Sequence, residues 1–149
     1  MTIHLHLETK NECIRFSFVH HWNCDEIQSL YESAGWWDFP LDNTIIHHII
    51  SGSYLFCVAV NKDGIAIGMG RILSDGISIG FIHDVYVMEI YQGLGIGSKL
   101  IQILIQSYLT DCRHHLILVA EPGTFPFYER QGFVSSKNTM FMQIQSGVQ

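Results

Sequence analysis

The chain has 149 residues, with 8 Lys plus Arg against 14 Asp plus Glu and a formal net charge of −6. A length of this order buries one sizeable core, so we expect a single domain over residues 1–149. The few basic residues are scattered along the chain, whereas proteins that bind nucleic acids through their phosphates cluster Lys and Arg. The composition therefore excludes a binder of this kind, and we expect no nucleic-acid partner.

Neither a secretion signal nor a membrane span is predicted. The first residues carry no positive segment followed by an apolar stretch, and no run approaches the roughly 18 apolar residues that cross a bilayer. The four cysteines, Cys13, Cys24, Cys57 and Cys112, are widely spaced and form no Cys-x-x-Cys pair, which predicts free thiols in a reducing compartment. We expect a cytoplasmic protein without a membrane partner.

The first half of the chain predicts short strands followed by two helices. Apolar and polar residues alternate over residues 2–8, and a β-rich run follows over residues 13–20, which indicates a hairpin or two edge strands. Asp25 is placed to cap a helix that ends at Gly35. A second helix is expected to start near residues 42–43 and to end at Gly52.

The second half predicts three strands, a helix, a strand, a helix and a closing strand. Turn-forming sequences separate the first three strands and favour an antiparallel meander, and the apolar period changes to 3.6 in the long helix. In chain order these elements are Tyr54–Val60, Ile65–Leu73, Ile77–Val87, Gly95–Leu109, Leu116–Ala120, Phe125–Gln131 and Met140–Ile144. The order predicts an α+β fold, with a mixed, mostly antiparallel central sheet flanked by helices and one late β-α-β crossover.

The most informative segment is the glycine-rich turn that opens the long helix, Gln92-Gly93-Leu94-Gly95-Ile96-Gly97-Ser98. Glycines let the backbone approach an anion closely, and the N–H groups of a helix start bind phosphate oxygens. A dinucleotide-binding fingerprint does not fit, because Ser98 stands where its third glycine is required. A Walker A loop does not fit either, because Ser98 and Lys99 stand in reversed order. Tight helix–strand packing without a ligand is the remaining alternative.

Two motifs together resemble those of the GCN5-related N-acetyltransferase (GNAT) family. Residues 92–97 match its [QR]-x-x-G-x-[GA] signature, and residues 128–133 resemble its later Y-x-x-x-G-F signature. The resemblance covers about residues 54–144. The chain departs from the family at Glu89, where many members have proline, and at Glu121, where many have asparagine.

The resemblance implies transfer of an acetyl group from acetyl-CoA to a primary amine, by direct attack within a ternary complex. It also implies that the Ile77–Val87 strand bulges and separates from the next strand, so that its backbone pairs with the pantetheine arm of the cofactor. The implied cofactor-binding residues are Val85, Tyr86, Val87, Gln92, Gly93, Leu94, Gly95, Ile96, Gly97, Ser98 and Tyr128.

The resemblance assigns catalytic chemistry to a few side chains. Tyr128 is implied as the general acid toward the coenzyme A thiolate, because a phenol with a pKa of about 10 is protonated at neutral pH; packing beside the sulfur is the alternative. His83 is the best candidate base, and a structural core histidine is the alternative. Strand alternation turns Asp84 to the opposite face, where it anchors structure, whereas a site-facing Asp84 would replace His83 as the base. Glu121 is a second alternative base or a ligand of the amine.

An aromatic loop is the candidate acceptor site. By resemblance, Trp36, Trp37 and Phe39 lie beside the acceptor pocket, and their ring faces suit a hydrophobic or aromatic amine; packing against the core is the alternative. We favour a small-molecule primary amine as the acceptor, ahead of a peptide or protein amine. The rival function is a non-catalytic acyl-CoA-binding or regulatory module. An unpaired edge of the N-terminal strands offers a second copy a place to pair, as a homodimer.

The paired histidines His20-His21, His47-His48 and His114-His115 do not predict a metal site. Adjacent residues on a strand or helix diverge, and neither ligand spacing nor a carboxylate cluster accompanies these pairs. We expect no metal cofactor.

Overall fold

The computed structural model describes residues 5–37, 42–111 and 115–144. The chain divides into two compact units, Met1–Leu118 and Val119–Gln149. The described helix of the second unit is α4 (Phe125–Arg130). The elements of the first unit are β1 (His6–Glu8), β2 (Cys13–Phe18), α1 (Cys24–Ser33), α2 (Ile45–Ser51), β3 (Leu55–Val60), β4 (Ala66–Ser74), β5 (Ile79–Val87), the short 3₁₀ helix η1 (Glu89–Tyr91), α3 (Ile96–Asp111) and β6 (His115–Ile117).

The strands of the first unit form one sheet in the order β1-β2-β3-β4-β5-β6. Neighbouring strands are antiparallel except β5 and β6, which are parallel. A parallel pair needs a crossover connection, and α3 provides it between β5 and β6. The predicted α+β fold, with a mostly antiparallel sheet and a late β-α-β crossover, is confirmed.

The meander forms where the sequence predicts it because short polar side chains close its turns. The Asn61 side chain accepts hydrogen bonds from the backbone N–H groups of Asp63 and Ile65, and Asp75 accepts from those of Ile77 and Ser78. Asx side chains that bond the backbone in this way mimic a turn. The β3–β4 and β4–β5 turns are therefore fixed locally.

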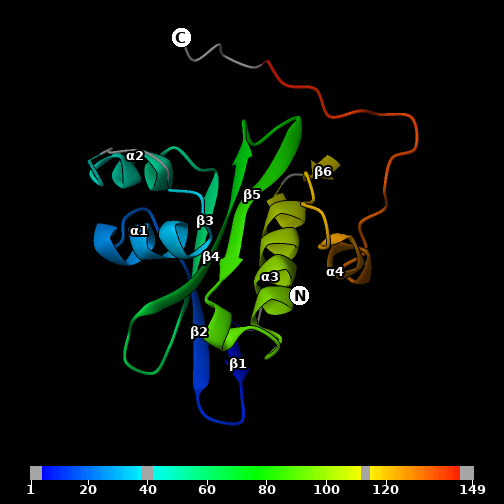
Figure 1. The fold of residues 1–149 in the computed structure, drawn as a ribbon. Coiled ribbons are helices and arrows are strands. Elements are labelled where there is room, and N and C mark those ends of the chain that lie inside the picture. The colour runs from blue at the N-terminus through cyan, green and yellow to red at the C-terminus, as the bar shows by residue number, and fades with distance from the viewer. Residues whose placement is uncertain (1–4, 38–41, 112–114, 145–149) are drawn as a thin grey trace. The chain divides into compact units, whose positions relative to one another are not determined.

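Helices cover both faces of the sheet (Figure 1). On one face, α1 and α2 pack on the sheet through a buried cluster of Ile27, Leu30, Tyr31, Ile46, Ile50, Phe56, Val58, Val60, Ala66 and Met69. On the other face, α3 contacts β3, β4 and β5 through its buried Leu100, Ile101, Leu104 and Tyr108. The core therefore has two layers with the sheet between them, as amphipathic helices on an apolar sheet require.

Three predicted details are corrected. The N-cap of α1 is Asn23 and not Asp25, because the Asn23 side chain accepts hydrogen bonds from the backbone N–H groups of Asp25 and Glu26. The strand expected at Leu116–Ala120 is β6, which ends at Ile117. The segment Met140–Ile144 is not a strand: in the described part of the chain no strand pairs with it, and an isolated strand is not stable in water.

No helix within the described residues is both long enough and apolar enough to span a membrane.

Candidate functional site

A β-bulge in the middle of β5 shapes the candidate site. Met69 lies opposite Tyr86 and Arg71 lies opposite His83, so the two residues 84–85 face Gly70 alone. Two residues against one define a bulge, which bends the strand and re-aims its side chains. The backbone of Asp84 has a φ of 52°, in the left-handed region that Asp adopts more readily than most residues.

The bulge overturns the prediction that Asp84 and His83 point to opposite faces. Nδ1 of His83 lies 2.7 Å from Oδ1 of Asp84, and the Asp84 side chain is 13% exposed against 43% for His83. Strand alternation holds only for regular pleating, and the extra residue interrupts it. Asp84 is therefore a direct partner of the predicted base.

Two further side chains complete what we call the Asp84 cluster, which consists of Tyr31, Arg71, His83 and Asp84. The hydroxyl of Tyr31, on α1, donates to Oδ2 of Asp84 at 2.7 Å. Nε of Arg71, on β4, donates to the same oxygen at 2.7 Å, and Nη2 of Arg71 lies 3.2 Å from Nδ1 of His83. Sequence reasoning missed both residues, although a lone Arg in the apolar run Ile65–Leu73 signals a buried acid partner.

The electrostatics of the cluster favour an ionised Asp84. Burial raises the pKa of its carboxyl, but the hydrogen bonds from His83 and Tyr31 and the charge of Arg71 outweigh burial and hold that pKa below the ordinary 3.8. Burial, together with the negative charge of Asp84, raises the pKa of the Tyr31 phenol. Tyr31 is therefore a hydrogen-bond donor at neutral pH and Asp84 an acceptor.

One edge of β5 is open beside this cluster. β6 pairs with β5 only over Ile79–Phe81, and among the described residues no other strand pairs with that edge. Apart from the Val87 carbonyl, which accepts a hydrogen bond from the Gln92 amide, the backbone of residues 82–87 along that edge has no strand partner among the described residues. An extended ligand can bind such an edge by strand-like pairing. This stretch contains the predicted cofactor-binding residues Val85, Tyr86 and Val87.

The glycine turn follows directly and leads into α3. Gly93 and Gly95 have φ values of 77° and 82°, and a Cβ at either position would meet no atom within 4 Å. The N–H of Lys99 donates to the carbonyl of Gly95 at 3.0 Å, so Gly95 stands at the N-cap of α3 (Ile96–Asp111). The Gln92 amide donates to the Val87 carbonyl at 2.8 Å, which ties the turn to the end of β5.

The aromatic residues predicted for the acceptor site contact the cluster. The ring of Trp36 lies 5.9 Å from that of Tyr86 and 6.4 Å from that of Tyr31, and the ring of Trp37 lies 6.0 Å from that of Tyr31. Trp36 is 41% exposed, so it retains a face toward solvent. Phe39 lies outside the described residues.

Tyr128 and Glu121 belong to the second unit. In α4 the ring of Tyr128 packs edge-on against Phe133, with centroids 6.0 Å apart. The helix ends in a Schellman arrangement, in which the N–H of Phe133 donates to the Tyr128 carbonyl and Gly132 has a φ of 96°. The Y-x-x-x-G-F motif thus fixes Tyr128 locally, and burial raises the pKa of its phenol. Glu121 is exposed in the loop before α4, because β6 ends at Ile117 and does not reach it.

Residues 32–144 match the family model described as "Acetyltransferase (GNAT) domain". The chain belongs to the GNAT family. A solved structure shares the fold: a probable acetyltransferase from Staphylococcus aureus superposes with a TM-score of 0.76 at 21% identity, over 89% of this chain and 98% of that one. The expected family and fold are confirmed, and membership supports an acetyltransferase.

Two relatives are longer than this GNAT chain. An uncharacterized N-acetyltransferase ycf52 from Pyropia yezoensis is 32% identical over 114 residues, which cover 75% of this chain and 65% of the relative. A protein from Glycine max named histone acetyltransferase TAP1 is 30% identical over 118 residues, which cover 72% of this chain and 50% of the relative. The GNAT chain therefore spans about half to two thirds of the length of these relatives.

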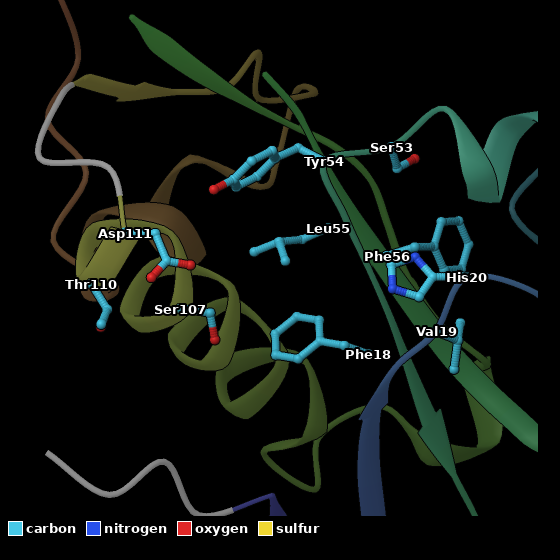
Figure 2. A pocket seen from close by; sticks show the side chains of 10 residues that line it. All are labelled: Phe18, Val19, His20, Ser53, Tyr54, Leu55, Phe56, Ser107, Thr110 and Asp111. Atoms are coloured by element: carbon cyan, nitrogen blue, oxygen red, sulfur yellow. The ribbon is translucent and has the colours of Figure 1, made fainter. Parts of the chain in front are cut away.

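A separate cavity of about 380 Å³ lies where β2 ends, β3 begins and α3 completes its last turns (Figure 2). Its lining consists of Phe18, Val19, His20, Ser53, Tyr54, Leu55, Phe56, Ser107, Thr110 and Asp111. None of the predicted site residues lines it. Ser53 links its rim to the Asp84 cluster, because Nη1 of Arg71 lies within 3.5 Å of the Ser53 hydroxyl. Among the described residues, no group of three or more His, Cys, Asp or Glu side chains is arranged to hold a metal ion.

The Asp84 cluster predicts a pH-dependent contribution to the stability of this GNAT chain. Because the native pKa of Asp84 lies below its ordinary 3.8, the ionised carboxylate stabilises the fold above pH 3.8, and this contribution is lost as the pH falls through the native pKa. Asp84→Asn should therefore lower the free energy of unfolding by about 3 kcal/mol at pH 7, with the difference from wild type shrinking below pH 3.8. Denaturant unfolding from pH 7 down to pH 3 measures this; a constant difference across that range would contradict it.

Proposed function

We propose that this chain is an acetyl-CoA-dependent N-acetyltransferase that acts on a primary amine by direct attack in a ternary complex. The observation that carries the proposal is the exposed glycine turn, which opens α3 and is bonded through Gln92 to the end of the open-edged strand β5. N–H groups at a helix start bind phosphate oxygens, and an open strand edge binds an extended chain. A phosphate-bearing ligand with a long amide-containing arm matches both features, and the family match supports acetyl-CoA.

The cofactor proposal assigns backbone groups rather than side chains. Acetyl-CoA, when bound, supplies the thioester whose acyl group is transferred. The backbone of residues 92–98 is proposed to bind its pyrophosphate, and the free edge of Val85–Val87 to pair with the pantetheine arm. A backbone N–H near Val85 is proposed to polarise the thioester carbonyl, as a preorganised donor aimed at developing negative charge does.

The catalytic proposal uses two side chains. His83 is proposed as the general base that removes the proton of the amine, because imidazole accepts protons near neutral pH and its side chain is 43% exposed. Tyr128 is proposed as the general acid toward the departing thiolate. Burial raises the pKa of its phenol, so the group keeps its proton at neutral pH and is able to donate it. Glu121 stays an alternative base or amine ligand.

The cofactor proposal predicts that a glycine substitution in the turn weakens acetyl-CoA binding, whereas an equivalent substitution elsewhere in the chain does not. Gly95→Ala and Gly64→Ala are matched, because both glycines have a φ of 82° and neither Cβ would meet an atom within 4 Å. Each should cost about 1 kcal/mol of stability through backbone strain. Gly95→Ala should weaken acetyl-CoA binding more than about 10-fold, the equivalent of one lost charge-assisted hydrogen bond, and Gly64→Ala should leave it unchanged.

Thermal unfolding with acetyl-CoA, coenzyme A, NAD and ATP measures these affinities, because a ligand that binds only the native state raises the unfolding temperature. Wild type should respond to the two coenzyme A compounds alone. No response to them, or a larger one to NAD, would overturn the cofactor proposal. Equal losses in both glycine variants would remove the turn from the binding site.

The acid proposal predicts that Tyr128→Phe lowers kcat by about 100-fold, the usual scale of general acid catalysis, while the KM for acetyl-CoA changes little. Phenylalanine keeps the ring that packs on Phe133, so the unfolding temperature should not change. Tyr108→Phe is the matched control, because Tyr108 is buried in α3 beside Ser74. This substitution should leave kcat unchanged. Steady-state kinetics decide the matter: unchanged kcat in Tyr128→Phe would remove the acid role.

The acceptor proposal is a small primary amine with an apolar or aromatic body. Trp36 offers a partly exposed ring beside Tyr86 of β5, and aromatic faces attract a cationic amine. The relative named as a histone acetyltransferase supports a peptide amine as the second candidate.

Trp36→Ala should raise the KM for aromatic amines by about 10-fold, in keeping with a cation–π contact of 1–2 kcal/mol, and should leave the KM for acetyl-CoA unchanged. Rates with aromatic amines, aliphatic amines and a lysine peptide test this prediction. If every acceptor KM is unchanged while the unfolding temperature falls, Trp36 only packs. If acetyl-CoA binds but no acceptor is acetylated, the chain is a non-catalytic acyl-CoA-binding module.

Cytoplasmic location and homodimer formation stay predictions. Cys13, Cys24 and Cys57 are free thiols, in keeping with a reducing compartment. β1 pairs with β2 at the end of the sheet, so it offers the edge that a second copy would use.

A further inference from the structure

The two oxygens of Asp84 have different partners. Oδ2 accepts hydrogen bonds from the Tyr31 hydroxyl and from Nε of Arg71, each at 2.7 Å, whereas Oδ1 contacts Nδ1 of His83 at 2.7 Å. We propose that Asp84 is a positioning residue that holds His83 in the tautomer with its hydrogen on Nδ1, so that Nε2 carries the lone pair that accepts the proton of the amine. This inference rests on the proposed function, and it assigns roles to Asp84, Tyr31 and Arg71 beyond it.

The donor and acceptor inventory decides the tautomer. An ionised carboxylate only accepts hydrogen bonds, and neutral imidazole has one N–H and one bare nitrogen. A bare Nδ1 at 2.7 Å from Oδ1 would set two lone pairs against each other, whereas an Nδ1–H makes a short charge-assisted hydrogen bond. The hydrogen of neutral His83 therefore lies on Nδ1, and Nε2 is bare.

Arg71 does not reverse this assignment. Its Nη2 lies 3.2 Å from Nδ1 of His83 and can only donate, so it would favour a bare Nδ1. That distance is longer than the 2.7 Å contact with the carboxylate, and the guanidinium already donates to Asp84 through Nε. The shorter contact to the opposite charge is the stronger one.

The carboxylate is held rigidly enough to impose a tautomer. Tyr31 comes from α1, Arg71 from β4 and Asp84 from the bulge in β5, and the side chains of Arg71 and Asp84 are each only 13% exposed. Two donors from different elements fix Oδ2, which fixes the direction of Oδ1. The three residues thus act on the amine only through His83.

The proposed proton transfer and acyl transfer balance in protons and electrons. Nε2 of His83 takes one proton from the ammonium group and the imidazole becomes imidazolium, whose Nδ1–H stays bonded to Asp84. The freed nitrogen lone pair forms the bond to the thioester carbon, and the carbon–sulfur bond breaks to release the thiolate. The nitrogen then loses its second proton to become the amide, and the thiolate takes up one proton, so the products are the amide, the coenzyme A thiol and the imidazolium of His83. Among the described residues, His83 contacts Asp84 on its own strand, Arg71 from β4 and the ring of Phe81. Asp84 is the anion of these three and stabilises the imidazolium.

Asp84→Asn makes the proposal testable because the amide has one predictable orientation. Tyr31 and Arg71 both donate to the position of Oδ2, so the amide oxygen must occupy it. The amide NH₂ then faces Nδ1 of His83 and donates to it. This reverses the tautomer, puts the hydrogen on Nε2 and removes the base. The serine-protease triad is a precedent: replacing its orienting Asp by Asn leaves the histidine in the wrong tautomer and lowers kcat.

The experiment records ¹⁵N–¹H correlation spectra of the histidine rings at a pH where His83 is neutral, with His83→Gln identifying its signals. Wild type should show the hydrogen on Nδ1, and Asp84→Asn should show it on Nε2. With acetyl-CoA and an acetylated amine, kcat/KM should fall by about 100-fold in Asp84→Asn, with the KM for acetyl-CoA unchanged. Asp75→Asn is the matched control on the turn before β5, and it should preserve both the tautomer and kcat/KM.

The outcomes separate the two proposals. A wild-type hydrogen on Nε2, or an unchanged tautomer in a folded Asp84→Asn, overturns the positioning role whatever the activity. The wild-type tautomer is read without Asp84→Asn, so failure of Asp84→Asn to fold leaves this test intact. A chain that transfers no acetyl group but shows the hydrogen on Nδ1 supports the positioning geometry and counts against the proposed function alone.

Discussion

The bulge that sets Asp84 and Val85 against Gly70 is the constraint on which the rest of the candidate site depends. It turns Asp84 away from its regular strand position and toward Arg71 and Tyr31. Gly70 is tightly packed, because a Cβ there would lie 3.0 Å from a methyl group of Leu104 in α3 and would make that side chain shift. The strained φ of Asp84 costs on the order of 1–2 kcal/mol, and the charged hydrogen bonds to its carboxylate, each of about 1.5–3 kcal/mol, offset that cost.

The same cluster joins three elements of the first unit. Arg71 is a cation on a buried strand, and its charge requires a buried anion. Asp84 satisfies that requirement and at the same time accepts the Tyr31 hydroxyl from α1. The cluster therefore fixes α1 on the sheet and orients His83 with one set of contacts. Replacing Asp84 leaves Arg71 without its anion and lowers the free energy of unfolding by about 3 kcal/mol. Most domains have a free energy of unfolding of about 5–15 kcal/mol, so the variant is expected to fold.

The cofactor side of the proposed site depends on backbone rather than on charge. The open edge of β5 and the start of α3 are bonded to each other through Gln92, and both offer backbone hydrogen-bonding groups to a ligand. This arrangement explains why an acidic chain with few bases can be proposed to bind a phosphate-bearing cofactor. Backbone N–H groups and the helix dipole supply the positive potential that Lys and Arg supply elsewhere.

The sequence by itself determined the features that depend on neighbouring residues. These features depend on residues only a few positions apart in the chain. They are the turns closed by Asn61 and Asp75, the long helix with its glycine start, and the two family motifs. Only the tertiary structure decided which side chains meet. Tyr31, Arg71 and Asp84 are far apart in the chain, and the bulge that brings them together depends on how β4 pairs with β5. A register of pairing is a property of two strands, so the alternation of one strand could not reveal that Asp84 and His83 are partners.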